Sequence, residues 1–106
     1  MARKEFIAYL DESNENRYRH QHVRERGRIV EFRIQYEALI AGLWHPVVRY
    51  DSAHDQPHRD ILHPDGTQTK EWYTGFSNAE VLALGQRDIM RNWRRYREAY
   101  EKERRT

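Results

Sequence analysis

A cluster of histidines and aspartates is the part of this sequence whose side chains could do chemistry. Four histidines and four aspartates fall between His45 and Asp65. Imidazole titrates near neutral pH, and a neighbouring carboxylate can orient it and stabilise its charged form. A cluster of this kind can transfer protons, bind a metal ion or form a polar loop, and the sequence leaves these three alternatives open.

Metal-free cleavage of RNA is one reaction that the cluster could support. It needs a base for the ribose 2′-hydroxyl, an acid for the leaving oxygen and a cation for the charge on the phosphate. His58 is a candidate acid or base, and Asp51 or Asp60 could orient it. Arg49 or Arg59 could then hold the phosphate. In the competing interpretation, the two aspartates accept backbone N–H groups of the loop, and Arg49 pairs with one of them.

A metal ion is the second possibility. Histidine and carboxylate ligands suit zinc, manganese or iron. Pro57 excludes the helix that would place His54 and His58 on one face, whereas His58 and Asp60 would share one face of a strand. The spacing matches no established metal motif, so we predict no metal and no cofactor, and keep a His/Asp metalloprotein as an alternative. Its candidate ligands are His54, His58, His63, Asp51, Asp55 and Asp60.

Alternating apolar and polar residues predict the sheet that must position this cluster. From Arg28 to Ile40, β-branched and aromatic residues alternate with polar ones, which is typical of a half-buried strand. Short connections between consecutive strands favour an antiparallel meander. The sheet is predicted over about residues 28–73, with further strands at 43–51, 58–62 and 67–73 and turns at 41–42 and 63–66.

The pattern leaves three details of the sheet open. Pro46 indicates that the strand over 43–51 lies at an edge or begins after the proline, and we expect Trp44 to share a face with Val48 and Tyr50. Residues 6–10 fit a short helix or an edge strand. Residues 17–23 alternate in a way that allows one additional strand.

A long helix is predicted after the sheet, over about residues 77–103. Ser77 and Glu80 have the spacing of a capping box. The apolar residues that follow form one stripe, which we expect to cover one face of the sheet; a partner helix or a second copy in a homodimer is the alternative cover. The predicted fold is α+β, an antiparallel β-meander of four to five strands covered by this helix. The stripe consists of Leu82, Ile89, Trp93, Tyr96 and Tyr100.

Composition and charge narrow the class of protein. A chain of 106 residues is expected to form a single domain over 1–106. The lack of cysteine fits a cytoplasmic protein, and no apolar run reaches the length of a membrane span. Residues 17–33 and 87–106 each carry a net charge of +4 and flank an acidic middle. Arginine suits phosphate contacts, so we predict nucleic-acid binding by Arg87, Arg91, Arg94 and Arg95. Solvation of the surface or contact with a protein partner is the alternative.

The stretch from Val48 to Asp60 resembles a motif of small, poorly characterised bacterial and archaeal proteins. In these proteins an Arg-Tyr-Asp strand end leads into a histidine-bearing loop and a Pro-His pair. TumE-like toxins of toxin–antitoxin systems are similar, although they have a second histidine cluster where this chain has Arg59 and Asp60. The resemblance implies action on RNA and a cognate antitoxin or other protein as partner. It implies a site formed by Arg49, Tyr50, Asp51, His54 and His58.

The leading hypothesis from the sequence is therefore a small cytoplasmic RNA-directed protein, and more specifically a metal-independent ribonuclease of toxin type. A non-catalytic module that binds nucleic acid or protein is the second hypothesis, and a metalloprotein is the third. The predicted catalytic residues are Arg49, Asp51, His54, His58, Arg59 and Asp60.

Overall fold

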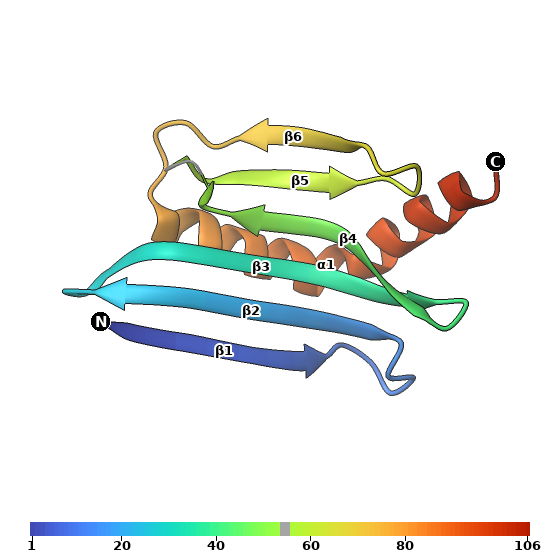
Figure 1. The fold of residues 1–106 in the computed structure, drawn as a ribbon, viewed down its shortest axis with the longest axis horizontal. Coiled ribbons are helices and arrows are strands. Elements are labelled where there is room, and N and C mark those ends of the chain that lie inside the picture. The colour runs from blue at the N-terminus through green and yellow to red at the C-terminus, as the bar shows by residue number, and fades with distance from the viewer. Residues whose placement is uncertain (54–55) are drawn as a thin grey trace.

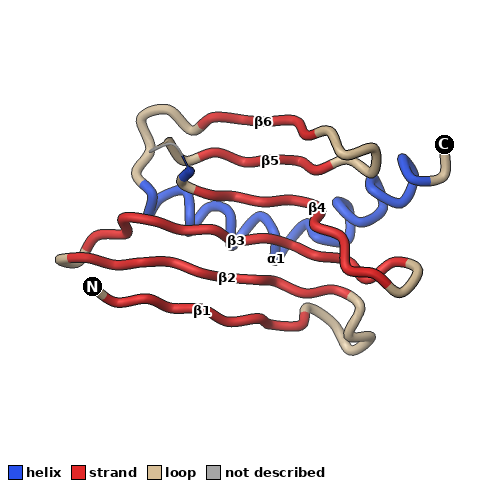
Figure 2. Tube along the Cα trace, in the orientation of Figure 1, coloured by secondary structure: helices blue, strands red, loops and turns tan. Residues whose placement is uncertain are grey.

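In the computed structural model, which describes residues 1–53 and 56–106, six antiparallel strands form one sheet and a long helix lies behind it (Figure 1). Each strand pairs with its neighbours in the sequence, so the sheet is a simple meander (Figure 2). The predicted α+β meander with its C-terminal helix is confirmed, whereas the sheet has six strands and not four or five. The elements are β1 (Ala2–Tyr9), β2 (Asn16–Glu25), β3 (Arg28–Ile40), β4 (Leu43–Asp51), β5 (His58–Leu62), β6 (Gln68–Trp72) and α1 (Asn78–Arg104).

The N-terminal hairpin accounts for the difference in strand number. The sequence left residues 6–10 open between helix and strand, and the structure places most of them in β1, an edge strand exposed on both faces. In β2 the residues that face the helix side include Tyr18 and His20, both buried. The apolar–polar alternation of β2 is weak in the sequence, because its buried side chains include tyrosine and histidine, which carry polar groups. Phe6 of β1 supports this strand by stacking on His20 with ring centroids 4.6 Å apart.

The hydrophobic core lies between α1 and the two central strands. Even-numbered residues of β3 from Phe32 to Ala38 point toward the helix and are buried, as are Val48 and Tyr50 of β4. The capping box is present as predicted, because the Ser77 side chain accepts from the Glu80 backbone and Glu80 bonds back to Ser77 N. The helix contributes Val81, Leu82, Ile89, Trp93 and Tyr100 as buried apolar residues.

A bulge in β4 explains two departures from the expected pattern. The register between β3 and β4 shifts between Tyr36 and Glu37, opposite Pro46 and Val47. The extra residue moves Trp44 to the face opposite that of Tyr50, where the Arg17 guanidinium lies 3.8 Å from its ring centroid. Pro46 lies inside β4, but β5 pairs only with residues 48–51. At Pro46 the strand is therefore locally an edge, which is where a sheet tolerates proline.

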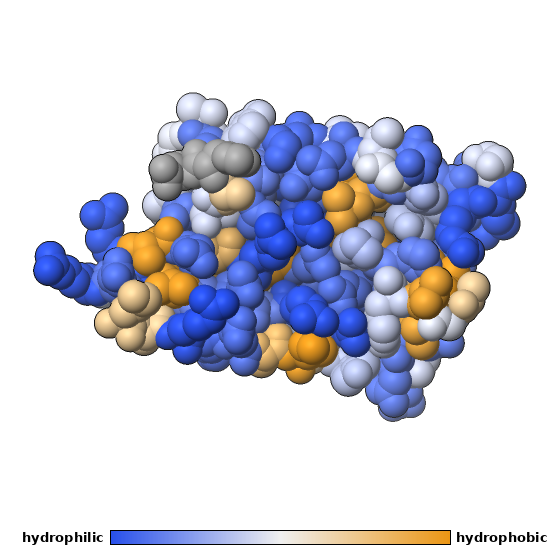
Figure 3. Space-filling model, in the orientation of Figure 1, coloured by the Kyte–Doolittle hydropathy of each residue, from blue (hydrophilic) through white to orange (hydrophobic). Residues whose placement is uncertain are grey.

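The face of the sheet opposite α1 is open and hydrophilic (Figure 3). It carries the side chains of Arg33, Gln35 and Glu37 of β3 and, after the bulge, of Arg49 and Asp51 of β4, all of them charged or amide residues. Several of them are nevertheless buried by their neighbours, among them Gln35 and Glu37. Among the described residues, no helix combines the length with the apolar character that crossing a bilayer requires. The polar open face and the covered face thus offer two chemically different places for a functional site.

Candidate functional site

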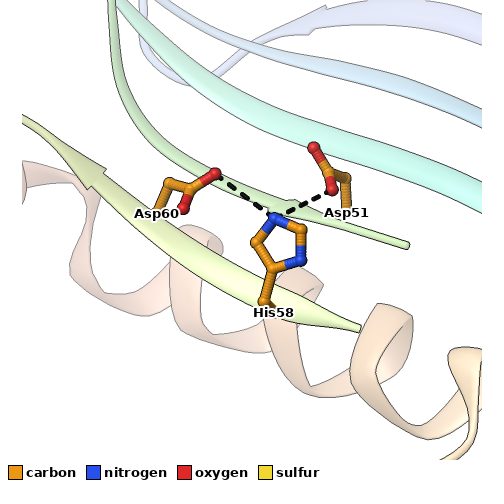
Figure 4. A group of neighbouring side chains, drawn as sticks. All are labelled: Asp51, His58 and Asp60. Atoms are coloured by element: carbon orange, nitrogen blue, oxygen red, sulfur yellow. Dashed lines mark ion pairs between the residues drawn. The ribbon is translucent and has the colours of Figure 1, made fainter. Parts of the chain in front are cut away.

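Three of the predicted catalytic residues converge on the open face. Asp51 ends β4 and His58 begins β5, and the two are directly paired across the ladder. Asp60 follows two residues later and therefore shares the face of His58. The imidazole presents its Nε2 edge between the two carboxylates (Figure 4), 3.1 Å from Asp51 Oδ1 and 3.4 Å from Asp60 Oδ2. All three side chains are at most 5% exposed.

Backbone and basic groups hold this cluster in place. His58 Nδ1 lies 3.0 Å from the Gln56 carbonyl oxygen, so Nδ1 carries the proton that it donates there. Asp51 Oδ1 accepts from the Ala53 N–H at 3.0 Å, which is the loop-capping role of the competing interpretation. Lys70 Nζ lies 3.2 Å from Asp60 Oδ1. That oxygen is buried and has no partner with hydrogen-bond geometry in the described part of the chain.

Two further residues that the sequence did not single out border the cluster. Arg33 lies opposite Asp51 in the register, with its NH2 group 3.3 Å from Asp51 Oδ2. The ring of Trp72 lies 5.0 Å from that of His58, and Trp72 is 47% exposed. Both follow from cross-strand pairing, as does the position of Lys70 opposite Asp60. The register between strands would have identified these residues, but the spacing of residues along a single strand does not determine that register.

Arg49 shares the open face but belongs to a neighbouring ionic group. Its Nε donates to Gln35 Oε1 at 2.7 Å, and Gln35 in turn donates to Glu37. Glu37 also pairs with Arg17 at 2.6 Å and with Arg19 at 3.2 Å. The predicted pairing of Arg49 with an aspartate is therefore replaced by a bond to the Gln35 amide. Arg49 lies beside the cluster without an ion pair to it among the described residues.

Arg59 is separated from the cluster by the sheet itself. Because side chains alternate along a strand, Arg59 points to the helix side of β5 while His58 points to the open face. Its NH1 group donates to the hydroxyl of Tyr96 in α1 at 3.0 Å, and its NH2 group lies 3.4 Å from Glu71. A phosphate that bound next to His58 on the open face would not reach Arg59. The fold therefore does not place His58 and Arg59 in one active site.

Arg59 instead lines a hollow between α1 and β5, which we call the α1–β5 groove. One part of it, about 420 Å³, is lined by Arg59, Asp88, Asn92, Arg95 and Tyr96. A second part, about 330 Å³, shares Arg59, Asp88 and Asn92 and extends along the helix. Three of the four arginines predicted to bind nucleic acid line the groove, whereas Arg94 lies 4.4 Å from the ring centroid of Trp93. The second part is completed by Tyr50, Tyr73, Leu84, Arg87 and Arg91.

Both carboxylate oxygens of Asp88, the acidic residue that lines the groove, accept hydrogen bonds. Asp88 accepts hydrogen bonds from the hydroxyls of Tyr50 and Tyr96 and from the Asn92 amide. Burial, with a further contribution from the hydrogen bond to Asp88, raises the pKa of Tyr96 to about 12. The pKa of Tyr50 is raised for the same reasons. Both tyrosines are therefore neutral hydrogen-bond donors at physiological pH. The groove thus contains four arginines and one carboxylate, that of Asp88, whose oxygens already accept hydrogen bonds.

The remaining histidines of the sequence cluster have other roles or positions. His63 lies 2.9 Å from Glu103 and 2.8 Å from the Thr69 hydroxyl, so it connects the β5–β6 turn to the end of α1. His45 lies 3.3 Å from the Tyr100 hydroxyl on the helix side. His54 and Asp55 lie outside the described residues. Of the candidate metal ligands, the structure thus brings together Asp51, His58 and Asp60.

Comparison with known proteins places the chain in a family. The family model described as "Domain of unknown function (DUF7718)" matches residues 1–106. Neither a curated protein nor a solved structure matches the chain. Because the match extends over the whole chain, the protein belongs to the DUF7718 family.

Proposed function

We propose that this protein binds RNA and that the phosphate backbone lies along the α1–β5 groove. The observation that carries the proposal is the gathering of Arg59, Arg87, Arg91 and Arg95 around this groove. The sequence separates Arg59 from the helix arginines by 28 residues or more, yet the fold brings them to one hollow. Guanidinium groups bind phosphate oxygens in a bidentate manner, which gives geometric selectivity as well as charge.

The arrangement along α1 favours an extended ligand over a single ion. Arg87, Arg91 and Arg95 are spaced four residues apart, so each step advances about 6 Å along the helix axis. All three are exposed, and the acidic neighbour Asp88 is occupied by its own hydrogen bonds. Tyr73, which is partly buried at one end of the groove, offers an aromatic face on which a base could stack. A row of charges with an aromatic side chain at one end suits a single strand.

Binding of a single-stranded RNA, followed by fluorescence anisotropy at about 50 and 200 mM salt, tests the proposal. The wild type should bind with a strong salt dependence. The double variant Arg91→Glu with Arg95→Glu should lose at least about tenfold in affinity and show a shallower salt slope. A control with the same charge change, Arg24→Glu with Arg26→Glu at the remote β2–β3 end, should bind almost as the wild type does. Equal losses in both variants would mean that net charge and not the groove governs binding, and the proposal would be abandoned.

A metal-independent ribonuclease of toxin type is the second candidate, favoured by the convergence of Asp51, His58 and Asp60. His58 could act as acid or base through Nε2, the nitrogen that faces both carboxylates, while the Gln56 carbonyl oxygen holds Nδ1. The side chain of His58 is 2% exposed, and its Nε2 lies 3.1 Å from Asp51 Oδ1, so a ribose hydroxyl would have to displace a carboxylate to reach Nε2. Cleavage of RNA in EDTA by the wild type, and its loss in His58→Gln, is the expected result; an inert wild type removes this candidate without affecting the binding proposal.

A further inference from the structure

We propose that Asp51, His58 and Asp60 bind one divalent transition-metal ion. One ligand atom from each of these residues lies within 4.8 Å of the other two, and all three residues are buried. Figure 4 shows the Nε2 edge of the imidazole directed between the two carboxylates, as a shared ligand would require. The site lies on the open face of the sheet, so the proposal stands independently of RNA binding in the α1–β5 groove. It is an alternative to the metal-independent ribonuclease, because the ion would occupy the same Nε2 atom of His58.

The separations between ligand atoms fit a first-row metal ion. Bonds of about 2.0–2.2 Å place neighbouring ligand atoms about 3.3–3.6 Å apart in a tetrahedral site and about 2.8–3.1 Å apart in an octahedral one. His58 Nε2 lies 3.1 Å from Asp51 Oδ1 and 3.4 Å from Asp60 Oδ2. The third separation, between the two carboxylate oxygens, is within 4.8 Å, so an ion shared by the three atoms would draw the carboxylates together around it.

The surroundings of His58 prepare it to act as a ligand. Its Nδ1 donates to the Gln56 carbonyl oxygen at 3.0 Å, and this bond fixes the tautomer in which the Nε2 lone pair is free to coordinate. With a neutral imidazole, the three side chains carry a charge of −2, which Arg33, 3.3 Å from Asp51 Oδ2, and Lys70, 3.2 Å from Asp60 Oδ1, offset from the outer side. The ion would therefore bind the carboxylate oxygens that face His58. Asp60 faces His58 with Oδ2 and pairs with Lys70 through Oδ1, so each of its oxygens has a separate role.

The ligand types select the class of metal. A mixed set of one imidazole and two carboxylates suits Zn²⁺, Mn²⁺ or Fe²⁺, whereas Ca²⁺ and Mg²⁺ prefer oxygen ligands in larger number. Three protein ligands leave at least one coordination position for water or another ligand. A hollow of about 330 Å³, lined in part by Arg33, Asp51 and Ser52, adjoins the cluster and offers a path for an ion to enter.

The rival arrangement is metal-free. A doubly protonated His58 could form ion pairs with Asp51 and Asp60 and donate to both, and the cluster would then serve only the stability of the fold. Metal titration separates the two, because a purely structural cluster has no affinity for a divalent ion. Two other histidines provide a control for adventitious metal binding. The side chains of His20 and His22 are neighbours on one face of β2, with His20 Nε2 2.7 Å from His22 Nδ1, and could hold an adventitious ion.

The experiment is calorimetric titration of the EDTA-treated and dialysed protein with Zn²⁺, and separately with Ca²⁺. The proposal predicts one Zn²⁺ per chain and no Ca²⁺ binding. The isosteric variant Asp60→Asn should weaken Zn²⁺ binding by more than the roughly 10–100-fold that loss of an outer partner causes, whereas His22→Gln should leave it unchanged. No Zn²⁺ binding by the wild type, or binding that His22→Gln removes and Asp60→Asn does not, would overturn the proposal.

A measurement on the wild type alone tests the metal site even if a variant fails to fold. Mn²⁺ broadens the NMR signals of nuclei close to it. Substoichiometric Mn²⁺ should remove the imidazole signals of His58 while those of His63 and His22 persist. Broadening of the surface histidines with an unaffected His58 would contradict the assignment.

Discussion

His58 and Arg59 are consecutive residues of β5 whose side chains lie on opposite faces of the sheet. His58 faces Asp51 and Asp60 on the open face, and Arg59 donates to Tyr96 of α1 on the covered face. One histidine-rich segment thus contributes to two separate places, an acid–imidazole cluster and a basic groove. The two can be perturbed independently, because the thickness of the sheet lies between them.

Arg59 is expected to contribute to RNA binding. Replacing it by glutamine removes a charge from the α1–β5 groove while keeping a side chain of similar length, and should weaken binding of single-stranded RNA by about 3–10-fold. Arg19→Gln is the matched control, because Arg19 lies on the open face of β2 and its side chain is 48% exposed. An affinity loss in Arg19→Gln as large as that in Arg59→Gln would place the binding surface elsewhere. Fluorescence anisotropy at fixed ionic strength measures both.

Gly85→Ala is expected to destabilise the protein, although alanine is the better helix former by about 1 kcal/mol. An added Cβ at this position would lie 2.8 Å from the Tyr50 ring and 2.9 Å from Ile34 Cδ1. The ring cannot easily yield, since its hydroxyl is bonded to Asp88. Overpacking of this kind costs about 1–3 kcal/mol, so the free energy of unfolding in urea should fall. An increase in that free energy would show that α1 can move away from β4.

Asp88→Ala is expected to lower the free energy of unfolding by about 2–4 kcal/mol, because it leaves the hydroxyls of Tyr50 and Tyr96 without their charged acceptor. Glu98→Ala, an exposed acidic position of the same helix, should change it by less than about 0.5 kcal/mol. Urea unfolding of the three proteins at neutral pH provides the comparison. Equal effects at the two positions would assign the loss to helix charge and not to the hydrogen bonds.

His20 should make stability fall in acid. Burial, together with the charges of His22 and Lys4, lowers the pKa of His20 from 6.5 to about 4. Between these values the unfolded chain binds a proton that the folded protein does not, so stability is complete above pH 6.5 and declines as the pH falls toward 4. The contribution is roughly 1–3 kcal/mol. His20→Gln should flatten this part of the stability–pH curve relative to the wild type, and identical curves for the two proteins would contradict the assignment.

Much of the fold could be predicted from local pattern. The alternation in β3, the turn at Gly66 and the Ser77–Glu80 capping box each depend on short-range rules, and the structure contains all three. The apolar stripe of α1 likewise meets the sheet as expected. What the pattern left open was β1 and the full length of β2, because an edge strand exposed on both faces and a strand packed with tyrosine and histidine lack a clear apolar period.

The candidate site could be predicted only in part, because its assembly depends on register and on which face each side chain takes. The shared face of His58 and Asp60 follows from their spacing, and the structure has it. The partners Lys70 and Arg33 come from neighbouring strands, and a one-residue shift would have placed others there. The same alternation that joins His58 to Asp60 separates Arg59 from both.

The central claim is that RNA binds in the α1–β5 groove and not on the open face of the sheet. The most direct test is NMR mapping of the backbone and side-chain signals during titration with a short single-stranded RNA. We predict shifts at Arg59, Tyr73, Arg91 and Arg95, with unchanged signals at Arg33, Lys70 and Trp72. Shifts concentrated at the open-face residues, or no shifts at saturating RNA, would contradict the claim.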